Sequence, residues 1–195
     1  MLGISKDIKY PGLNVLPPGV ERHVVNGGGL TGFQIFPDDE LEIINNEGNQ
    51  ICEIICFDKD GNSDVGILNL KSNNDKNFIR NILSGNDETI LATNYQLKKR
   101  NLKISNSKSS IIFDLDTKPG EKIKLKSKDK CYTIFSAPGE DMDVTKQNPP
   151  TDLTIFVKRA KIVNDKELNV IPDPVFEPAY EENINKESCI SYEVK

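Results

Sequence analysis

The sequence predicts a mainly β protein, either a barrel or a sandwich, with one or two short helices inserted around residues 75–99. Apolar and polar side chains alternate with a period of two in several short segments, which is the pattern of β-strands. Gly, Pro, Asn and Asp residues, which favour turns, separate these segments. Only the region around residues 75–99 shows the three-and-four spacing of apolar side chains that is typical of a helix.

The central prediction is one β-hairpin, with a first strand at residues 40–44, a turn at 45–49 and a return strand at 50–57. Both faces of the return strand are mostly apolar, so we expect it to be central in a sheet and covered on both sides. Glu53 is the charged exception in this strand. Because an unpaired buried charge is costly, we expect Glu53 to be buried and paired with a cation or with several backbone N–H groups.

The other elements follow in chain order. Further strands are expected at residues 20–25, 32–36, 65–70, 110–115, 122–125, 131–136 and 151–159. The first helix is expected to be capped by Asn74 or Asp75 and to end at Gly85, and a second helical piece runs over residues 87–99.

These elements divide the chain into four parts. Residues 1–19 form an N-terminal arm, residues 20–163 the β-domain and residues 164–182 a Pro-rich linker. Residues 183–195 are predicted to be the first strand of a following domain. Because this strand starts and then stops, we expect the natural protein to continue beyond it.

Composition excludes several classes of protein. A net charge of -5 argues against nucleic-acid binding, which normally needs a basic face. No apolar run has the length of a membrane span and the N-terminus lacks a signal-peptide layout, so a cytoplasmic location with no membrane contact is expected. Four cysteines are too few for a disulfide framework in a chain of 195 residues.

Two short motifs resemble ligand-binding loops but lack the context that such loops need. Residues 27–32 match the G-x-G-x-x-G spelling of a dinucleotide site, yet a strand-like segment follows where a helix is required. Residues 58–64 have the oxygen spacing of a calcium loop, but Ser63 and Asn69 stand where Gly and Glu are needed. We therefore expect a flexible turn at the first motif and a solvated turn at the second.

Local sequence supplies no complete set of metal ligands. On a strand, Cys52 and Cys56 would lie about 13 Å apart, too far for a disulfide or for a shared zinc ion, so they are interpreted as small buried hydrophobic residues. His23 is the single histidine of the chain. Asp114 and Asp116 would share one face of a strand; they are interpreted either as surface carboxylates or as a coupled acidic pair.

The segment ELEIINNEGNQICEIICF resembles the urea-carboxylase-associated domain family, in which a strand, a Gly-x-Gln turn and an acid-bearing strand follow one another. Gly48, Gln50 and Glu53 match these marks, with Glu53 in place of the usual Asp. The downstream His-Asp and Cys signature of the stand-alone members is missing. The resemblance implies a carboxyguanidine-deiminase-like activity on a small polar nitrogen compound, with Glu53, Gln50 and His23 as the candidate catalytic residues.

A longer resemblance covers PPGVERHVVNGGGLTGFQIFPDDELEIINNEGNQICEI, APGEDMDVTKQNPPTDLTIFVKR and PDPVFEPAYE. Together these segments are similar to the N-terminal region of multidomain proteins related to the aminomethyltransferase of the glycine cleavage system. This resemblance implies a non-catalytic binding or assembly domain of a folate-dependent transferase. Tetrahydrofolate would then bind the full-length protein rather than this chain, and the downstream domains of the same chain would be its partners. A protein-interaction module is a third hypothesis.

Overall fold

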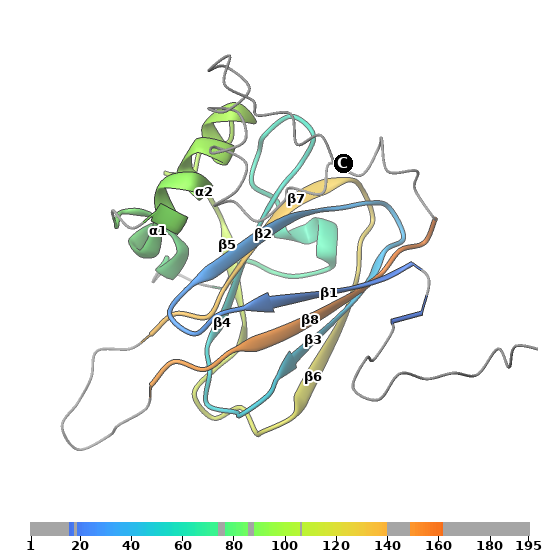
Figure 1. Ribbon diagram of the computed structural model, residues 1–195. Coiled ribbons are helices and arrows are strands. Elements are labelled where there is room, and N and C mark those ends of the chain that lie inside the picture. The colour runs from blue at the N-terminus through green and yellow to red at the C-terminus, as the bar shows by residue number, and fades with distance from the viewer. Residues whose placement is uncertain are drawn as a thin grey trace, which may run out of the picture.

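The computed structural model (Figure 1) describes residues 16–17, 19–73, 77–85, 88–105, 107–139 and 149–161. These residues form two four-stranded antiparallel sheets with short helices, so the predicted mainly β class is confirmed, and it is a sandwich. In chain order the elements are β1 (Val20–Val25), β2 (Leu30–Ile35), β3 (Glu40–Asn45), β4 (Cys52–Phe57), the 3₁₀ helix η1 (Val65–Leu68), α1 (Phe78–Leu83), α2 (Glu88–Lys99), β5 (Ser109–Phe113), β6 (Glu121–Lys126), β7 (Cys131–Ser136) and β8 (Leu153–Lys158).

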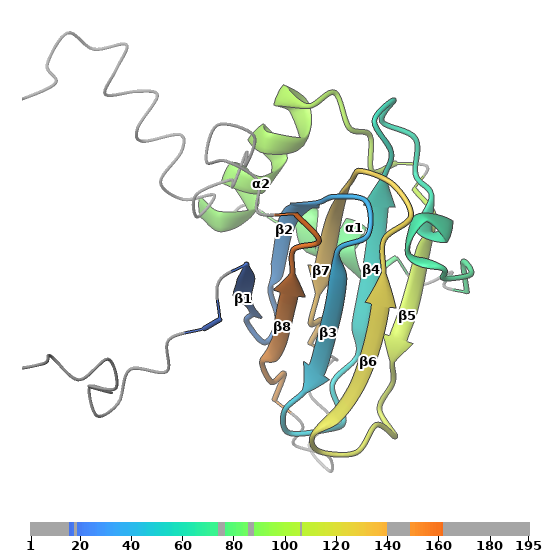
Figure 2. The same cartoon turned by 90° about the vertical axis from the view of Figure 1, so that its right-hand side faces the viewer.

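The chain changes sheet at almost every connection between strands. The strand order is β1-β8-β3-β6 in one sheet, here called sheet A, and β2-β7-β4-β5 in the other, sheet B. Figure 2 shows the two sheets packed one behind the other. Eight antiparallel strands that alternate between two sheets in this order form a jelly roll.

The predicted hairpin of residues 40–57 is wrong, although both of its strands exist. β3 pairs with β6 and β8, whereas β4 pairs with β5 and β7 in the other sheet. The turn residues do adopt the positive φ angles that hairpins use, at Gly48 (φ 76°) and Asn49 (φ 54°). However, the Asn49 N–H donates to the carbonyl of Thr117, so the loop is held by a distant segment and carries the chain across to sheet B.

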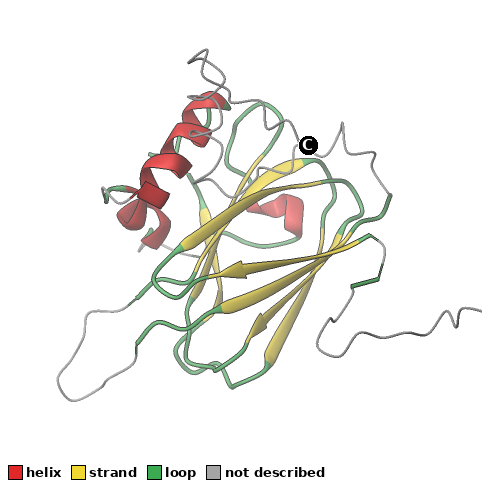
Figure 3. Cartoon of the chain, viewed as in Figure 1, coloured by secondary structure: helices red, strands yellow, loops and turns green. Residues whose placement is uncertain are grey.

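Two apolar clusters explain why β4 is buried on both faces, as the sequence predicts. Cys52, Ile54 and Cys56 face the interior between the sheets. Ile55 and Phe57 face the outside of sheet B, where they pack with apolar side chains of α1 and α2. Figure 3 shows these two helices together on one side of the sandwich. The described helices therefore cover sheet B and leave the outer face of sheet A open.

Two local predictions are corrected by the structure. The sequence predicts a strand at residues 65–70, but residues 65–68 form the 3₁₀ helix η1, because the carboxylate of Asp64 accepts the Gly66 N–H at 2.8 Å and starts a helical turn. Helix α1 begins after Asn77, which has a φ of 52° and makes no side-chain cap, rather than after Asn74 or Asp75. Those two residues lie outside the described part of the chain.

The remaining strands agree with the sequence to within two residues at each end, and β1 and β7 agree at both ends. None of the described helices has the length and apolar character needed to cross a membrane. The predicted linker at residues 164–182 and the predicted strand at 183–195 lie outside the described residues.

Candidate functional site

Glu53 is buried beneath α1 on the outer face of sheet B. Its side chain is fully inaccessible to solvent, and its Oε2 accepts the backbone N–H of Ile79 at 2.6 Å. Ile79 is the second residue of α1, and the N-terminal end of a helix favours a carboxylate because its N–H groups have no partner within the helix. The predicted burial of Glu53 is confirmed, and a backbone N–H is one of its partners.

Gln50 joins three segments at one end of the sandwich. Its Nε2 donates to the carbonyls of Ile51 and Pro138, both at 2.9 Å. Its Oε1 accepts the backbone N–H of Thr151 at 2.7 Å. Because only 3% of Gln50 is exposed, the amide connects the start of β4 to the chain that leaves β7 and the chain that enters β8.

His23 lies on β1 and faces the interior of the sandwich. Its ring stacks on Phe33, with the ring centroids 4.1 Å apart and the ring planes 13° from parallel. Its Nε2 is 3.1 Å from Oε2 of Glu21. Glu53 faces the helices outside sheet B, so the structure does not bring the candidates Glu53 and His23 together.

His23 belongs instead to a partly buried group of ionisable side chains that we call the Arg159 cluster, made of Glu21, His23, Asp39 and Arg159. Arg159 follows β8, and its side chain is 6% exposed. Its Nε and Nη2 donate to the two carboxylate oxygens of Glu21, at 2.7 and 2.6 Å. Its Nη1 donates to Oδ2 of Asp39 at 2.6 Å and to the carbonyl of Gln34 at 3.0 Å.

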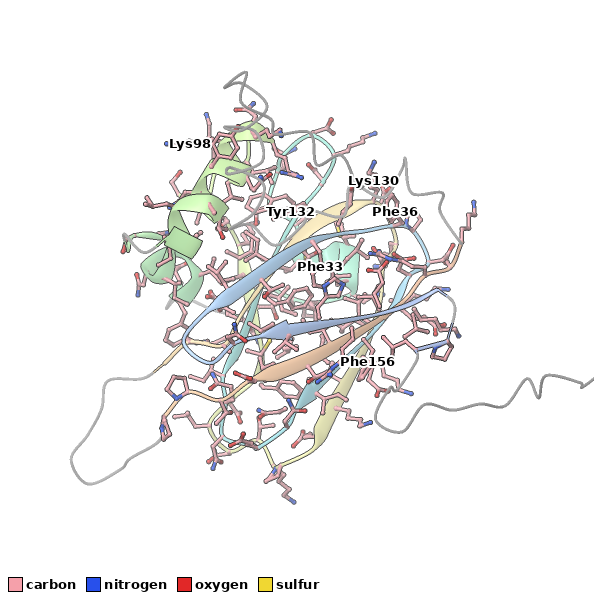
Figure 4. The ribbon with its side chains drawn as sticks, in the orientation of Figure 1. Phe33, Phe36, Lys98, Lys130, Tyr132 and Phe156 are labelled. Atoms are coloured by element: carbon pink, nitrogen blue, oxygen red, sulfur yellow. The ribbon has the colours of Figure 1, made fainter. Side chains whose placement is uncertain are left out.

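Electrostatics in the Arg159 cluster favour the charged forms of Glu21 and Arg159. Burial raises the pKa of Glu21, but hydrogen bonds from His23 and Arg159 outweigh it and lower this pKa to about 2. Burial lowers the pKa of Arg159, and its bonds to Glu21 and Asp39 raise it above the ordinary value. The guanidinium also lies 5.6 Å from the ring centroid of Phe36, which Figure 4 labels.

Asp39 fixes the path of the chain at this end of sheet A. It is 1% exposed and accepts the backbone N–H groups of Phe36 at 3.0 Å and of Ala160 at 2.9 Å. With the bond to Arg159, Asp39 therefore holds the exit of β8 against the connection between β2 and β3. Each of the three guanidinium nitrogens of Arg159 donates to a group of the chain itself, which makes the cluster a structural clamp rather than a site open to a substrate.

Sequence analysis identified His23 but missed Glu21, Asp39 and Arg159. The Glu21-x-His23 spacing was a usable signal, because residues two apart lie on one face of a strand. Arg159 is 138 residues from Glu21 and 120 from Asp39 in the chain. No local pattern reveals contacts at such separations.

The cysteines behave as small buried hydrophobic residues, as predicted for Cys52 and Cys56. Both are fully buried and free, as is Cys131, and the hydroxyl of Thr133 bonds to the sulfur of Cys56 at 3.6 Å. Burial raises the pKa values of Cys52 and Cys56. Within the described part of the chain, no three His, Cys, Asp or Glu side chains gather closely enough to hold a metal ion.

The loop motifs are turns, as predicted. Gly27 and Gly28 form the turn between β1 and β2. Asp58 stabilises the turn that follows it, because its Oδ1 accepts the N–H groups of Asp60 and Asn62 at 2.9 and 2.8 Å. Asp114 and Asp116 follow the end of β5 in an exposed turn, so the surface interpretation of this pair is the right one.

Comparison with known proteins gives one extended sequence similarity. No protein-family model matches the chain. Over 188 residues, the chain is 29% identical to the trimethylamine-oxide aldolase of Ruegeria pomeroyi. The alignment covers 96% of this chain and 24% of that protein, so the chain spans about a quarter of its relative's length.

A solved structure of a DUF1989 family protein from Silicibacter pomeroyi is also similar, with a TM-score of 0.40 and 10% identity. The match covers 73% of this chain and 80% of that chain. At this level of similarity we draw no conclusion about function from it.

Proposed function

We propose that this chain is a binding or assembly domain of an enzyme that acts on a small polar nitrogen compound. The supporting observation is the similarity to a trimethylamine-oxide aldolase, which extends over 96% of the chain. The aligned part is 24% of that enzyme, so the rest of such an enzyme has ample length to carry the chemistry. Trimethylamine oxide is the first substrate to test.

The contacts of the candidate residues support a non-catalytic role for the domain. Glu53 holds the start of α1, and Gln50 uses both amide donors on backbone carbonyls. His23 is stacked on Phe33 and bonded to Glu21. Each of these side chains would have to leave a buried partner in order to bind a substrate, and breaking buried polar contacts is costly. These contacts favour the assembly role over a deiminase-like active site.

Under this proposal the partners of the domain are downstream domains of a longer chain, and tetrahydrofolate is a cofactor proposed for that longer chain. The resemblance to the urea-carboxylase-associated family is consistent with an enzyme that handles nitrogen compounds. The resemblance to aminomethyltransferase-related proteins is the basis for the folate proposal.

A chimera tests the proposed function directly. In the Ruegeria pomeroyi aldolase, the aligned region would be replaced by this chain, and consumption of trimethylamine oxide would be followed by proton NMR. We expect the chimera to consume the compound and this chain alone to leave it unchanged. The matched control is the aldolase with the aligned region deleted.

Two results would contradict the proposal. Consumption of trimethylamine oxide by this chain alone would give the domain a catalytic role. A chimera that folds, as judged by circular dichroism, but is as inactive as the deletion control would mean that this chain does not replace the aligned region.

A further inference from the structure

The outward face of α2 presents two neighbouring apolar side chains to solvent. Leu91 is 55% exposed and Tyr95 is 41% exposed. The opposite face of the helix is buried, because Ile90 and Leu97 pack with the apolar side chains on the outside of sheet B. Leu91 and Tyr95 are four residues apart, so they are adjacent on the helix surface. Figures 1 and 2 both show α2 at the periphery of the sandwich, where another molecule can reach this face.

The two ends of this face differ in charge. A spacing of three residues, which keeps a helical residue on the same face, continues it from Leu91 to position 88 and from Tyr95 to position 98. Glu88 is the first residue of α2, and Lys98 and Lys99 belong to its last turn. Both lysines are exposed, and Figure 4 shows Lys98 at the outside of the molecule. The face therefore has an acidic N-terminal end, an apolar middle and a basic C-terminal end.

This order of charges is complementary to itself when two copies of α2 run antiparallel. Positions 91 and 95 each lie two residues from position 93, and positions 88 and 98 each lie five residues from it. With a two-fold axis at position 93, Leu91 of one copy lies beside Tyr95 of the other, and each acidic end lies beside a basic end. A two-fold interface requires this self-complementarity, because the same surface is used by both copies. In a parallel pair, ends of like charge would meet.

We propose that two copies of this chain associate through the outward face of α2 as an antiparallel, two-fold symmetric pair. Leu91 and Tyr95 form the apolar centre, and the oppositely charged ends flank it. The dipoles of antiparallel helices add to the attraction between the ends. The helix has 12 residues, so it is about 18 Å long. An interface of that length is smaller than those of stable complexes, and we expect a weak dimer whose population depends on concentration.

Sedimentation velocity of the purified chain, from micromolar to millimolar concentration, tests this proposal. The average sedimentation coefficient should rise with concentration as dimers form. Leu91→Gln keeps a good helix former but removes the apolar side chain from both copies, so the dissociation constant should rise by about tenfold or more. The matched control is Leu115→Gln, which removes an apolar side chain that is 40% exposed in the turn after β5. It should leave the association unchanged.

Two outcomes of this measurement would overturn the proposal. The first is a parent chain that stays monomeric up to millimolar concentration. The second is a dimer that Leu91→Gln and Leu115→Gln weaken equally, because its interface would then lie elsewhere. Circular dichroism and thermal unfolding establish that each variant is folded, as expected for substitutions at exposed positions.

An exchange of charges tests the antiparallel arrangement independently of Leu91. In Lys98→Glu/Lys99→Glu both ends of α2 are acidic, whereas Glu88→Lys introduces a basic residue at the N-terminal end. Each variant alone should associate less than the parent, because its ends no longer attract each other. An equimolar mixture should associate more than either variant alone, since opposite charges meet again at both ends of a mixed pair.

High salt should weaken the parent dimer and the mixed pair, because it screens charges at the surface. A mixture that sediments as the average of its two separate components would overturn the antiparallel pairing. Association of the parent that does not respond to salt would contradict the role of the charged ends.

Discussion

At the scale of single residues, one buried and one partly buried carboxylate hold this fold together in different ways. Glu53 accepts a helix N–H beneath α1, whereas Glu21 meets the buried guanidinium of Arg159. The contacts of both carboxylates are made with the chain itself and indicate a structural role. Their roles are therefore tested by stability rather than by activity.

Replacing Glu53 should loosen α1. In Glu53→Ala, the Ile79 N–H loses a buried acceptor and a void is left, so we expect a loss of about 2–4 kcal/mol in the free energy of unfolding. Glu53→Gln keeps an oxygen acceptor and should lose about half as much. Urea unfolding measures both variants. If Ala and Gln have the same small effect, the carboxylate does not anchor the helix.

Glu21 should make stability depend on pH in the acid range. Its folded pKa is about 2 and its ordinary value is 4.5, so the unfolded chain binds more protons between these values. The stabilisation is fully present above pH 4.5 and is lost as the pH falls from 4.5 towards 2. Because Glu21 is partly exposed, we expect about 1–2 kcal/mol after allowing for solvent screening.

Urea unfolding of the parent chain and of Glu21→Gln across this pH range measures the contribution of Glu21. The difference between them should shrink as the pH falls, since the variant lacks the group that titrates. Glu47→Gln, at an exposed loop position, is the control and should follow the parent curve. A constant difference between the parent and Glu21→Gln at all pH values would refute this linkage.

At the scale of elements, the connections between strands decide the topology. The turn at Gly27 is packed directly against the chain that enters β8. A Cβ atom at Gly27 would lie 2.2 Å from the carbonyl oxygen of Pro150 and 2.9 Å from the nitrogen of Thr151. The close approach of the Pro150 backbone therefore explains the glycine at position 27 of the G-x-G-x-x-G motif without a bound nucleotide.

Gly27→Ala should therefore destabilise the protein by about 1–3 kcal/mol, because backbone atoms must shift to admit the methyl group. The control is Gly29→Ala, whose Cβ would lie 3.2 Å from the carbonyl oxygen of Asn26 and needs a much smaller shift. Thermal unfolding compares the two variants. Equal effects would mean that the contact with Pro150 does not restrict this turn.

At the scale of the whole molecule, apolar side chains occupy the interior between the sheets. Within the described residues, no cluster of three potential metal ligands occurs. We therefore predict that the purified chain holds no stoichiometric zinc, iron or calcium. Elemental analysis measures the content, and a chelator should leave thermal unfolding unchanged. One equivalent of metal per chain would contradict the prediction and favour the deiminase-like hypothesis.

Folate binding gives a second test at this scale. We predict that this chain alone does not bind tetrahydrofolate tightly, because the proposed cofactor site belongs to downstream domains. Isothermal calorimetry with the purified chain should show no micromolar binding. Binding at that level would place the folate site within this chain. It would contradict the interpretation of the domain as purely structural.

The sequence by itself determined the fold class, most strand positions and the burial of Glu53. These features depend on local alternation of apolar residues and on the high cost of an unpaired charge among apolar neighbours, both of which are visible in a short window. It also identified the turns within the motifs at residues 27–32 and 58–64, because each motif lacked the neighbours that its function needs.

The tertiary structure alone decided which strands pair and which charges meet. The turn residues before β4 are compatible with a hairpin, but contacts with the distant residues Thr117 and Thr151 send the chain into the other sheet. Likewise, Arg159 meets Glu21 and Asp39 only because β1 and β3 flank β8 in sheet A. Strand pairing depends on contacts between residues far apart in the chain, and local propensity does not contain that information.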